Sequence, residues 1–205
     1  MERRKAATRQ KLIDVARGML AAETANTASI QDITEAADLG FGTFYNHFTS
    51  KAELFQAAIE DALEETGQLL DRLSSDDADP AVAFARSVRV VVRLGRSRPE
   101  LAKVLVRHGL TYIDSDRGLA PRAMRDIRNG IASGRFQVDN ERLAMACVAG
   151  SLLAVLHLSV TDPGTVDEAA CDQFAEQMLR VLGVSRREAR KLVAAPPPDA
   201  LNEVF

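Results

Sequence analysis

The chain has 205 residues, of which 46% are hydrophobic, with only 12 glycines and 7 prolines. This composition leaves little room for a disordered or all-β chain, and it supplies enough apolar surface for one large domain or for two smaller ones. The formal net charge of −3 gives no overall attraction to nucleic acid, but residues 1–17 carry six bases against two acids, an excess of four. An isolated charge run is usually a solvated surface, whereas beside a DNA-binding motif it adds affinity by displacing counterions.

The first predicted helix spans residues 4–22 and places its apolar side chains on one stripe. Ser29 can cap a second helix, because its hydroxyl would accept a free backbone N–H, and Asp32 three residues later suits a capping box. Residues 38–40 break the helical pattern, and Gly40 supplies backbone freedom at the break.

A third predicted helix covers residues 41–48. Phe44 and Phe48 lie four residues apart, so they share one face and are expected to point inward. Gly40 and Gly42 leave the start of this helix without bulky side chains, which lets its backbone approach another molecule and offers free N–H groups to phosphate. The second and third helices together form a compact hairpin with a surface suited to phosphate oxygens and base edges.

A long connecting helix is predicted over residues 51–73, because Ser50 and Glu53 form a capping box at its start. After a polar linker at 74–79, Pro80 suits the first turn of the next helix, and the chain continues as helices separated by polar or glycine-containing turns. The sequence therefore predicts an all-α fold of about nine or ten helices. We expect a head at 1–50, a body at 51–195 and a loose tail at 196–205.

Residues 40–54 read Gly-Phe-Gly-Thr-Phe-Tyr-Asn-His-Phe-Thr-Ser-Lys-Ala-Glu-Leu. This motif resembles the TetR family of transcriptional regulators, and the likeness extends over about residues 5–55; a weaker one lies at 129–139. The chain departs from the family pattern at Asp38-Leu39-Gly40, where members usually carry Gly-Val-Ser, and at Phe41, where many are polar. The operator sequence of a relative therefore cannot be transferred to this chain.

The resemblance implies a DNA-binding head, a ligand-sensing body and a homodimer joined through the last two long helices. Because the start of a recognition helix reaches base edges, we expect Gln31 to pair with adenine and Phe41 to touch a thymine methyl, while Thr43 and its neighbours hold phosphates. For Phe41, partial burial is the competing interpretation, and for Tyr45 and His47 it is ordinary packing. The residues predicted to contact DNA are Ser29, Gln31, Gly40, Phe41, Gly42, Thr43, Tyr45, His47 and Lys51.

The body offers candidates for a ligand pocket and for a subunit interface. A pocket needs apolar walls and a few polar groups, and the composition favours a small, mainly apolar effector. The polar residues in apolar surroundings are Arg107, His108, Tyr112 and His157. Helices at 139–161 and 165–182 carry more apolar surface than one protomer needs. The interface candidates on them are Leu152, Leu156, Phe174 and Met178, with core burial as the alternative.

Other classes of function find little support. The sequence has no metal-ligand spacing, phosphate loop or nucleophile elbow, so no enzyme, metal or cofactor is predicted. Cys147 and Cys171 are expected to pack in the core, a redox role being the weaker alternative. The apolar run at 143–160 suits a helix buried on several sides better than a membrane span, and the charged N-terminus is unlike a signal peptide, so we expect a cytoplasmic protein. The remaining alternative is a helical ligand carrier or adaptor without DNA function.

Overall fold

A computed structural model of the chain describes residues 2–74 and 79–194, and every regular element within them is helical, which confirms the all-α prediction. The tail expected at 196–205 and most of the linker expected at 74–79 lie outside these residues. The elements are α1 (Glu2–Ala21), α2 (Ile30–Ala36), α3 (Phe41–Phe44), α4 (Lys51–Ser74), α5 (Pro80–Ser97), α6 (Pro99–His108), the 3-10 helix η1 (Gly109–Tyr112), α7 (Leu119–Ala132), α8 (Glu141–Thr161), α9 (Glu168–Val181) and α10 (Arg186–Val193).

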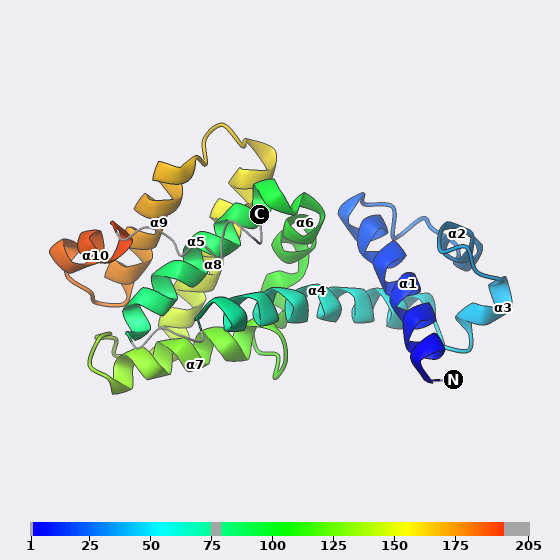
Figure 1. Ribbon diagram of the computed structural model, residues 1–205, viewed down its shortest axis with the longest axis horizontal. Coiled ribbons are helices and arrows are strands. Elements are labelled where there is room, and N and C mark those ends of the chain that lie inside the picture. Colours follow the sequence, from blue (N-terminus) through cyan, green and yellow to red (C-terminus); the bar gives the residue numbers. More distant parts are fainter. Residues whose placement is uncertain (1, 75–78, 195–205) are drawn as a thin grey trace.

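Figure 1 shows a head of three helices, α1 to α3, at one end of an elongated molecule and a body of α5 to α10 at the other. The connecting helix α4 starts beside α1 and runs into the body, where it packs against α5, α6 and α7. α1 also packs against α6, so the head meets the body through two elements. One apolar cluster extends from Leu12 of α1 through Phe44 and Leu54 to Leu105 of α6, so the core of the head is continuous with part of the body.

The turn between α2 and α3 orients the recognition hairpin. The Ser29 hydroxyl accepts the N–H of Asp32 at 3.1 Å, and the Asp32 carboxylate accepts the N–H of Ser29 at 2.8 Å, which confirms the predicted capping box. The unusual backbone conformation falls on Asp38, with φ of 54°, and not on Gly40, whose φ of −69° and ψ of 143° suit any residue. Aspartate tolerates the left-handed region because its short polar side chain can bond locally.

The recognition helix α3 is shorter than predicted, since it ends at Phe44 and residues 45–47 form a turn. Phe44 and Phe48 are only 0% and 2% exposed, which confirms that this pair points inward. The Ser50 hydroxyl caps α4 through the N–H of Glu53 at 3.2 Å. The Glu53 carboxylate, however, accepts the N–H of Thr49 at 2.7 Å instead of that of Ser50, so the predicted capping box is displaced by one residue.

Helix α8 is apolar on nearly all sides, yet one side has no partner among the described residues. Leu143 and Leu158 on this side are 62% and 43% exposed, and Cys147 and Ala154 between them are exposed as well. The prediction that Cys147 packs in the core is therefore wrong, whereas Cys171 is buried as predicted, and the other sides of α8 pack against α5, α6, α7 and α9. Among the described residues α8 is the one helix long and apolar enough to cross a membrane, a criterion that core helices of soluble proteins also meet.

Candidate DNA-binding surface and ligand pocket

The outer side of the head hairpin presents aromatic side chains around an open backbone. Phe41 and Tyr45 are 52% and 55% exposed, and their rings meet edge to face with centroids 5.8 Å apart. No atom lies within 4 Å of the position that a Cβ on Gly42 would take, so the front of α3 is free for close approach. Partial burial of Phe41, the competing interpretation, is wrong, and the inward Phe44 holds α3 from behind through its contact with Tyr45 at 5.3 Å.

The two predicted DNA contacts at α2 are exposed but already hydrogen-bonded. The Gln31 amide donates to the Glu35 carboxylate at 2.8 Å, a bond that pairing with a base would have to replace. The Ser29 hydroxyl donates to the Asp32 carboxylate at 2.8 Å while it caps α2. Because this capping box places a negative charge beside Ser29, the predicted phosphate contact of Ser29 competes with its structural role.

Lys51 at the start of α4 has a structural role that the sequence did not reveal. Its ammonium group donates to the backbone carbonyls of Asn26 at 3.1 Å and Ala28 at 2.8 Å, in the loop between α1 and α2. A lysine ammonium has three donors, so one remains for a phosphate oxygen. Lys51 therefore ties the entry of α2 to the entry of α4, and its DNA contact stays a prediction.

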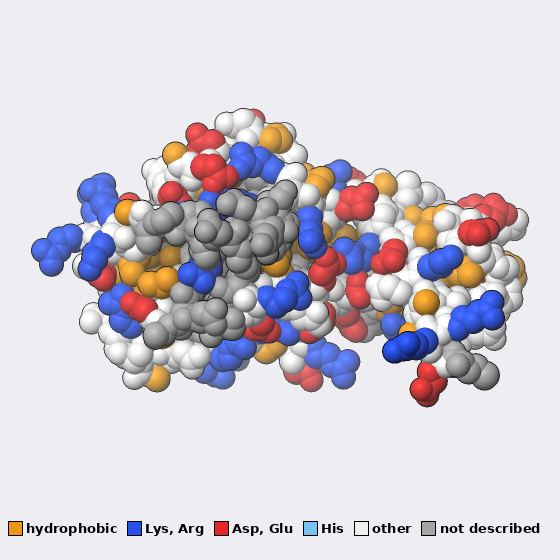
Figure 2. Space-filling view, viewed as in Figure 1, with side chains coloured by type: hydrophobic (Ala, Val, Ile, Leu, Met, Phe, Trp, Pro, Cys, Tyr) orange, Lys and Arg blue, Asp and Glu red, His pale blue; other side chains and the backbone are white. Residues whose placement is uncertain are grey.

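His47 lines a shallow hollow with two cations of the first helix turns, Lys5 and Arg9, and with Glu2. Partial burial, followed by the nearby charges of Lys5 and Arg9, lowers the pKa of His47 below its usual value. The guanidinium group of Arg9 stacks on the ring of Phe48 at 5.0 Å, which fixes it beside the hollow. Lys and Arg side chains gather on the N-terminal side of the head (Figure 2), so this hollow suits an anion such as a DNA phosphate.

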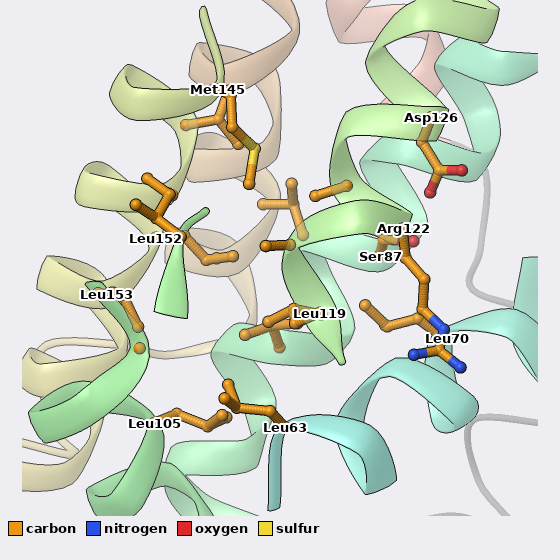
Figure 3. A pocket seen from close by; sticks show the side chains of 18 of the residues that line it. Leu63, Leu70, Ser87, Leu105, Leu119, Arg122, Asp126, Met145, Leu152 and Leu153 are labelled. Carbon is orange, nitrogen blue, oxygen red and sulfur yellow. The ribbon is translucent and has the colours of Figure 1, made fainter. Parts of the chain in front are cut away.

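The body encloses a cavity of about 90 Å³ between α4, α5, α6, η1, α7 and α8. Its walls are mostly leucine, valine, alanine and methionine side chains, as Figure 3 shows. Tyr112 of η1 lines it, and of the four predicted pocket residues it is the one that does so.

Three polar residues at the cavity were missed in the sequence: Ser87 of α5 with Arg122 and Asp126 of α7. The guanidinium group of Arg122 lies beside Leu70 of α4 (Figure 3), and burial raises the pKa of the Asp126 carboxyl. Arg122 and Asp126 are four residues apart on a helix that is otherwise apolar on this side, and this spacing was the available signal.

The other three predicted pocket residues lie outside this cavity. Arg107 binds the end of α1, because its guanidinium donates to the carbonyls of Leu20 at 2.8 Å and Ala21 at 3.2 Å and pairs with Glu23. A cation there suits the negative end of the helix dipole. His108 is half-buried outside the cavity, and His157 lies exposed on the outer side of α8, since both fall on the faces of their helices that turn away from the cavity.

The residues predicted for the subunit interface also lie inside the protomer. Leu156 is fully buried, Phe174 and Met178 are 7% and 5% exposed, and Leu152 lines the cavity. The sequence prediction chose these residues because they are large and apolar. In the structure, α8 and α9 pack against α5, and this packing buries them inside the protomer. The unpartnered side of α8 carries Leu143, Cys147, Ala154 and Leu158 instead.

Two family models match the chain. The model of bacterial regulatory proteins of the tetR family matches residues 12–58, and that of the tetracyclin repressor-like C-terminal domain matches residues 79–195. The first match contains the capping box at Ser29, the exposed aromatic pair and Lys51. The second contains the part of the cavity that lies beyond α4.

Individual relatives agree with these models. The crystal structure of RolR in complex with resorcinol is 34% identical, with 97% of this chain and 98% of RolR covered and a TM-score of 0.66. The probable HTH-type transcriptional regulator ArpR of Pseudomonas putida is 26% identical over 165 residues, or 71% of this chain and 78% of ArpR. The nucleoid occlusion factor SlmA of Haemophilus ducreyi is 22% identical over 108 residues, 52% of this chain, and the match spans about half of SlmA, 54%.

Proposed function

This chain belongs to the TetR family of DNA-binding transcriptional regulators, whose members are not enzymes, and we propose that it is a repressor released from its operator by a small, mainly apolar effector. The observation that carries this proposal is that the cavity and the connecting helix share residues. Leu63 and Leu70 of α4 line the cavity, and the start of α4 packs on α1 in the head. A molecule that changes the cavity walls therefore acts on the helix that positions the head.

The head, which we place at residues 1–50, would dock with α3 in the major groove. Gln31, Phe41 and Gly42 would face base edges, and Thr43, Tyr45 and Lys51 would hold phosphates. Exposure of Phe41 and Tyr45 and the open space at Gly42 support this orientation. The regulator would act in the cytoplasm, where double-stranded operator DNA is accessible.

Two heads are needed to match a near-palindromic operator, with recognition helices about 34 Å apart. We assign the unpartnered side of α8 to a second copy of the chain, because Leu143 and Leu158 expose a large apolar surface beside small residues that allow close helix approach. These residues replace the buried ones that the sequence suggested.

The effector class follows from the size and lining of the cavity. At about 90 Å³ it is smaller than a cavity of roughly 150 Å³ that takes benzene, so a single ring is the largest occupant that we expect, and its entry would require the walls to move outward. Ser87, Tyr112 and Asp126 can bond one or two hydroxyl groups of such a ring. RolR, similar over nearly its whole length, binds resorcinol, which supports a small hydroxylated aromatic compound as the effector of this chain.

Release requires the effector to prefer the form that does not bind DNA. A change from mostly bound to mostly free needs a preference of about 10⁴-fold, roughly 5.5 kcal/mol, and equal affinity for both forms would change nothing.

The proposal is tested by selecting genomic fragments with the intact protein and measuring their affinity by gel shift over a salt series, with and without resorcinol. We expect a steep loss of affinity as salt rises, because phosphate contacts release counterions, and a further loss with resorcinol. Gln31→Ala should relax the preference at one base by about 1–3 kcal/mol. A protein that binds resorcinol but no fragment at low salt would be a ligand carrier or adaptor instead.

A further inference from the structure

The polar edge of the cavity is built around one arginine that also grips the connecting helix. Nε of Arg122 donates to Asp71 at 2.6 Å, and its two terminal nitrogens each donate to a different oxygen of Glu64 at 2.9 Å. A further bond, at 2.7 Å, goes to the carbonyl of Gly118 at the start of α7. Arg125 adds a bond to Asp71 at 3.0 Å. We name these contacts of Arg122 and Arg125 with Glu64 and Asp71 the α4–α7 clamp.

The backbone of α4 is shaped to accept this arginine. Gly67 lies between Glu64 and Asp71 on the same side of α4, and a Cβ there would come within 2.5 to 2.9 Å of the guanidinium and Cδ of Arg122. Any larger residue would therefore displace the arginine. The bidentate bond has a large electrostatic effect, since hydrogen bonding to Arg122 lowers the pKa of Glu64 to about 2.

The same acidic stretch of α4 binds the head. Arg17 of α1 pairs with Asp61 at 3.0 Å and with Glu65 at 2.7 Å, and its side chain is 21% exposed. Glu65 also pairs with Arg98 beside α6. One turn of α4 thus carries carboxylates directed toward the head on one side and Glu64 directed toward the cavity wall on another.

We propose that Arg122 is the positioning residue that reports cavity occupancy to the head: in the DNA-binding form it holds α4 through Glu64 and Asp71, and an effector oxygen in the cavity draws its guanidinium away from them. This inference rests on the proposed function. The aliphatic stem of Arg122 lines the cavity while its guanidinium lies on α4, so one side chain contacts both places (Figure 3). An effector hydroxyl or carboxylate that accepts an N–H of Arg122 competes directly with Glu64.

Gly67→Ala provides a test that leaves the DNA surface unchanged and reaches the cavity lining through Arg122. The added methyl should displace Arg122 and thereby imitate the effector, so affinity for the selected fragment should fall about tenfold without resorcinol. Gly18→Ala is the matched control, because it adds a methyl to a helix at a position with no atom within 4 Å. It should leave affinity and the response to resorcinol as in the unmodified protein.

If thermal melting shows that Gly67→Ala is destabilised, a second variant tests the same proposal. Glu64→Gln has nearly the same shape but a weaker hold on Arg122, so it should also lower DNA affinity and reduce the further loss caused by resorcinol. Affinities of both variants within twofold of the unmodified protein, with full release by resorcinol, would overturn the role of Arg122 and leave the proposed function intact. Failure of the unmodified protein to bind DNA would refute the proposed function itself.

Discussion

The DNA-binding surface of the head comes from a short stretch of the chain, whereas the cavity of the body is lined by residues from a much longer stretch. The side chains expected to face DNA come from residues 29–51, and capping and one buried phenylalanine pair hold them. The cavity takes residues from α4, α5, α6, η1, α7 and α8, between Leu63 and Leu153. A substitution in the head should therefore change only the DNA contacts near it, whereas one in the cavity wall should also change the position of α4.

The polar groups of the two regions also differ in their state. In the head, Phe41 and Tyr45 are exposed and the space at Gly42 is open, whereas the Gln31 amide is already bonded to Glu35. Arg122 and Asp126 in the body are already bonded within the protein, so a ligand has to replace existing bonds. The front of α3 is thus open to DNA, whereas Gln31 in the head and the polar edge of the cavity would both bind by exchanging existing bonds.

The largest effect should come from the surface that joins two heads. Leu158→Arg places a charge on the unpartnered side of α8, and it should give a monomer with roughly 10²–10⁴-fold weaker operator affinity, because the second head no longer binds as part of the same molecule. Sedimentation velocity and gel shift measure the two quantities. Leu110→Arg is the control, since Leu110 is 56% exposed on η1 and is not one of the exposed residues of α8. If Leu158→Arg remains a dimer with full operator affinity, the dimer interface does not include this side of α8.

A smaller effect, confined to the body, should follow from filling the cavity. Ala123→Leu on α7 takes up most of the available space of about 90 Å³, so binding of resorcinol should weaken by about 100-fold, as expected when a steric clash replaces several apolar contacts. Titration calorimetry measures the loss. Operator affinity without ligand should stay within a few-fold of that of the unmodified protein. Loss of DNA binding in Ala123→Leu would show that the two regions are less separable than their structures indicate.

This contrast also explains what could be predicted from the sequence. The capping box at Ser29, the inward pair Phe44 and Phe48 and the all-α fold depend on residues three or four apart, and the sequence shows such spacings directly. The extent of α3 and the position of the left-handed residue were wrong. Both depend on the conformation of the turn between α2 and α3, where either Asp38 or Gly40 could adopt the left-handed conformation and Asp38 does so.

The body could not be predicted to the same depth, because its site depends on which face of each helix the packing selects. Tyr112 lines the cavity. His108 and His157 also lie on apolar helices, but their side chains face away from the cavity. The acidic residues of α4 have partners that the sequence does not indicate: Glu64 binds Arg122 of the body, and Glu65 binds Arg17 of the head. These two pairs span 58 and 48 residues of sequence, and no local pattern indicates them.

Lys51→Ala tests whether the head acts locally. Loss of a phosphate contact should weaken binding to all DNA sequences by about tenfold and lower the salt slope by about one. Because Lys51 also holds the carbonyls of Asn26 and Ala28, part of the loss would come from a looser α2. Hydrogen exchange of α2 amides separates the two contributions. Unchanged affinity in Lys51→Ala would remove Lys51 from the DNA surface and leave it a purely structural role.

The smallest effect should be a dependence of operator affinity on pH through His47. In the free protein, partial burial and the charges of Lys5 and Arg9 lower the pKa of His47, so its ring is mainly neutral at pH 7. A phosphate in the hollow favours the protonated ring, so the complex should bind more protons than the free protein. Affinity should therefore rise as pH falls from about 8 to 6, and this rise should be smaller than the effects of the substitutions above.

Fluorescence anisotropy at constant ionic strength measures this dependence, and His47→Gln should flatten it while it leaves a hydrogen-bonding side chain in place. His108→Gln is the control, since His108 lies in the body with its pKa lowered by burial and by Arg107. Glu2 lines the hollow with the cations, so Glu2→Gln should weaken the competition for Lys5 and Arg9 and raise affinity at every pH. If the pH dependence persists in His47→Gln and vanishes in His108→Gln, the group that takes up the proton on DNA binding is His108 of the body. The expectation that a residue of the head acts on DNA affinity directly would then be wrong.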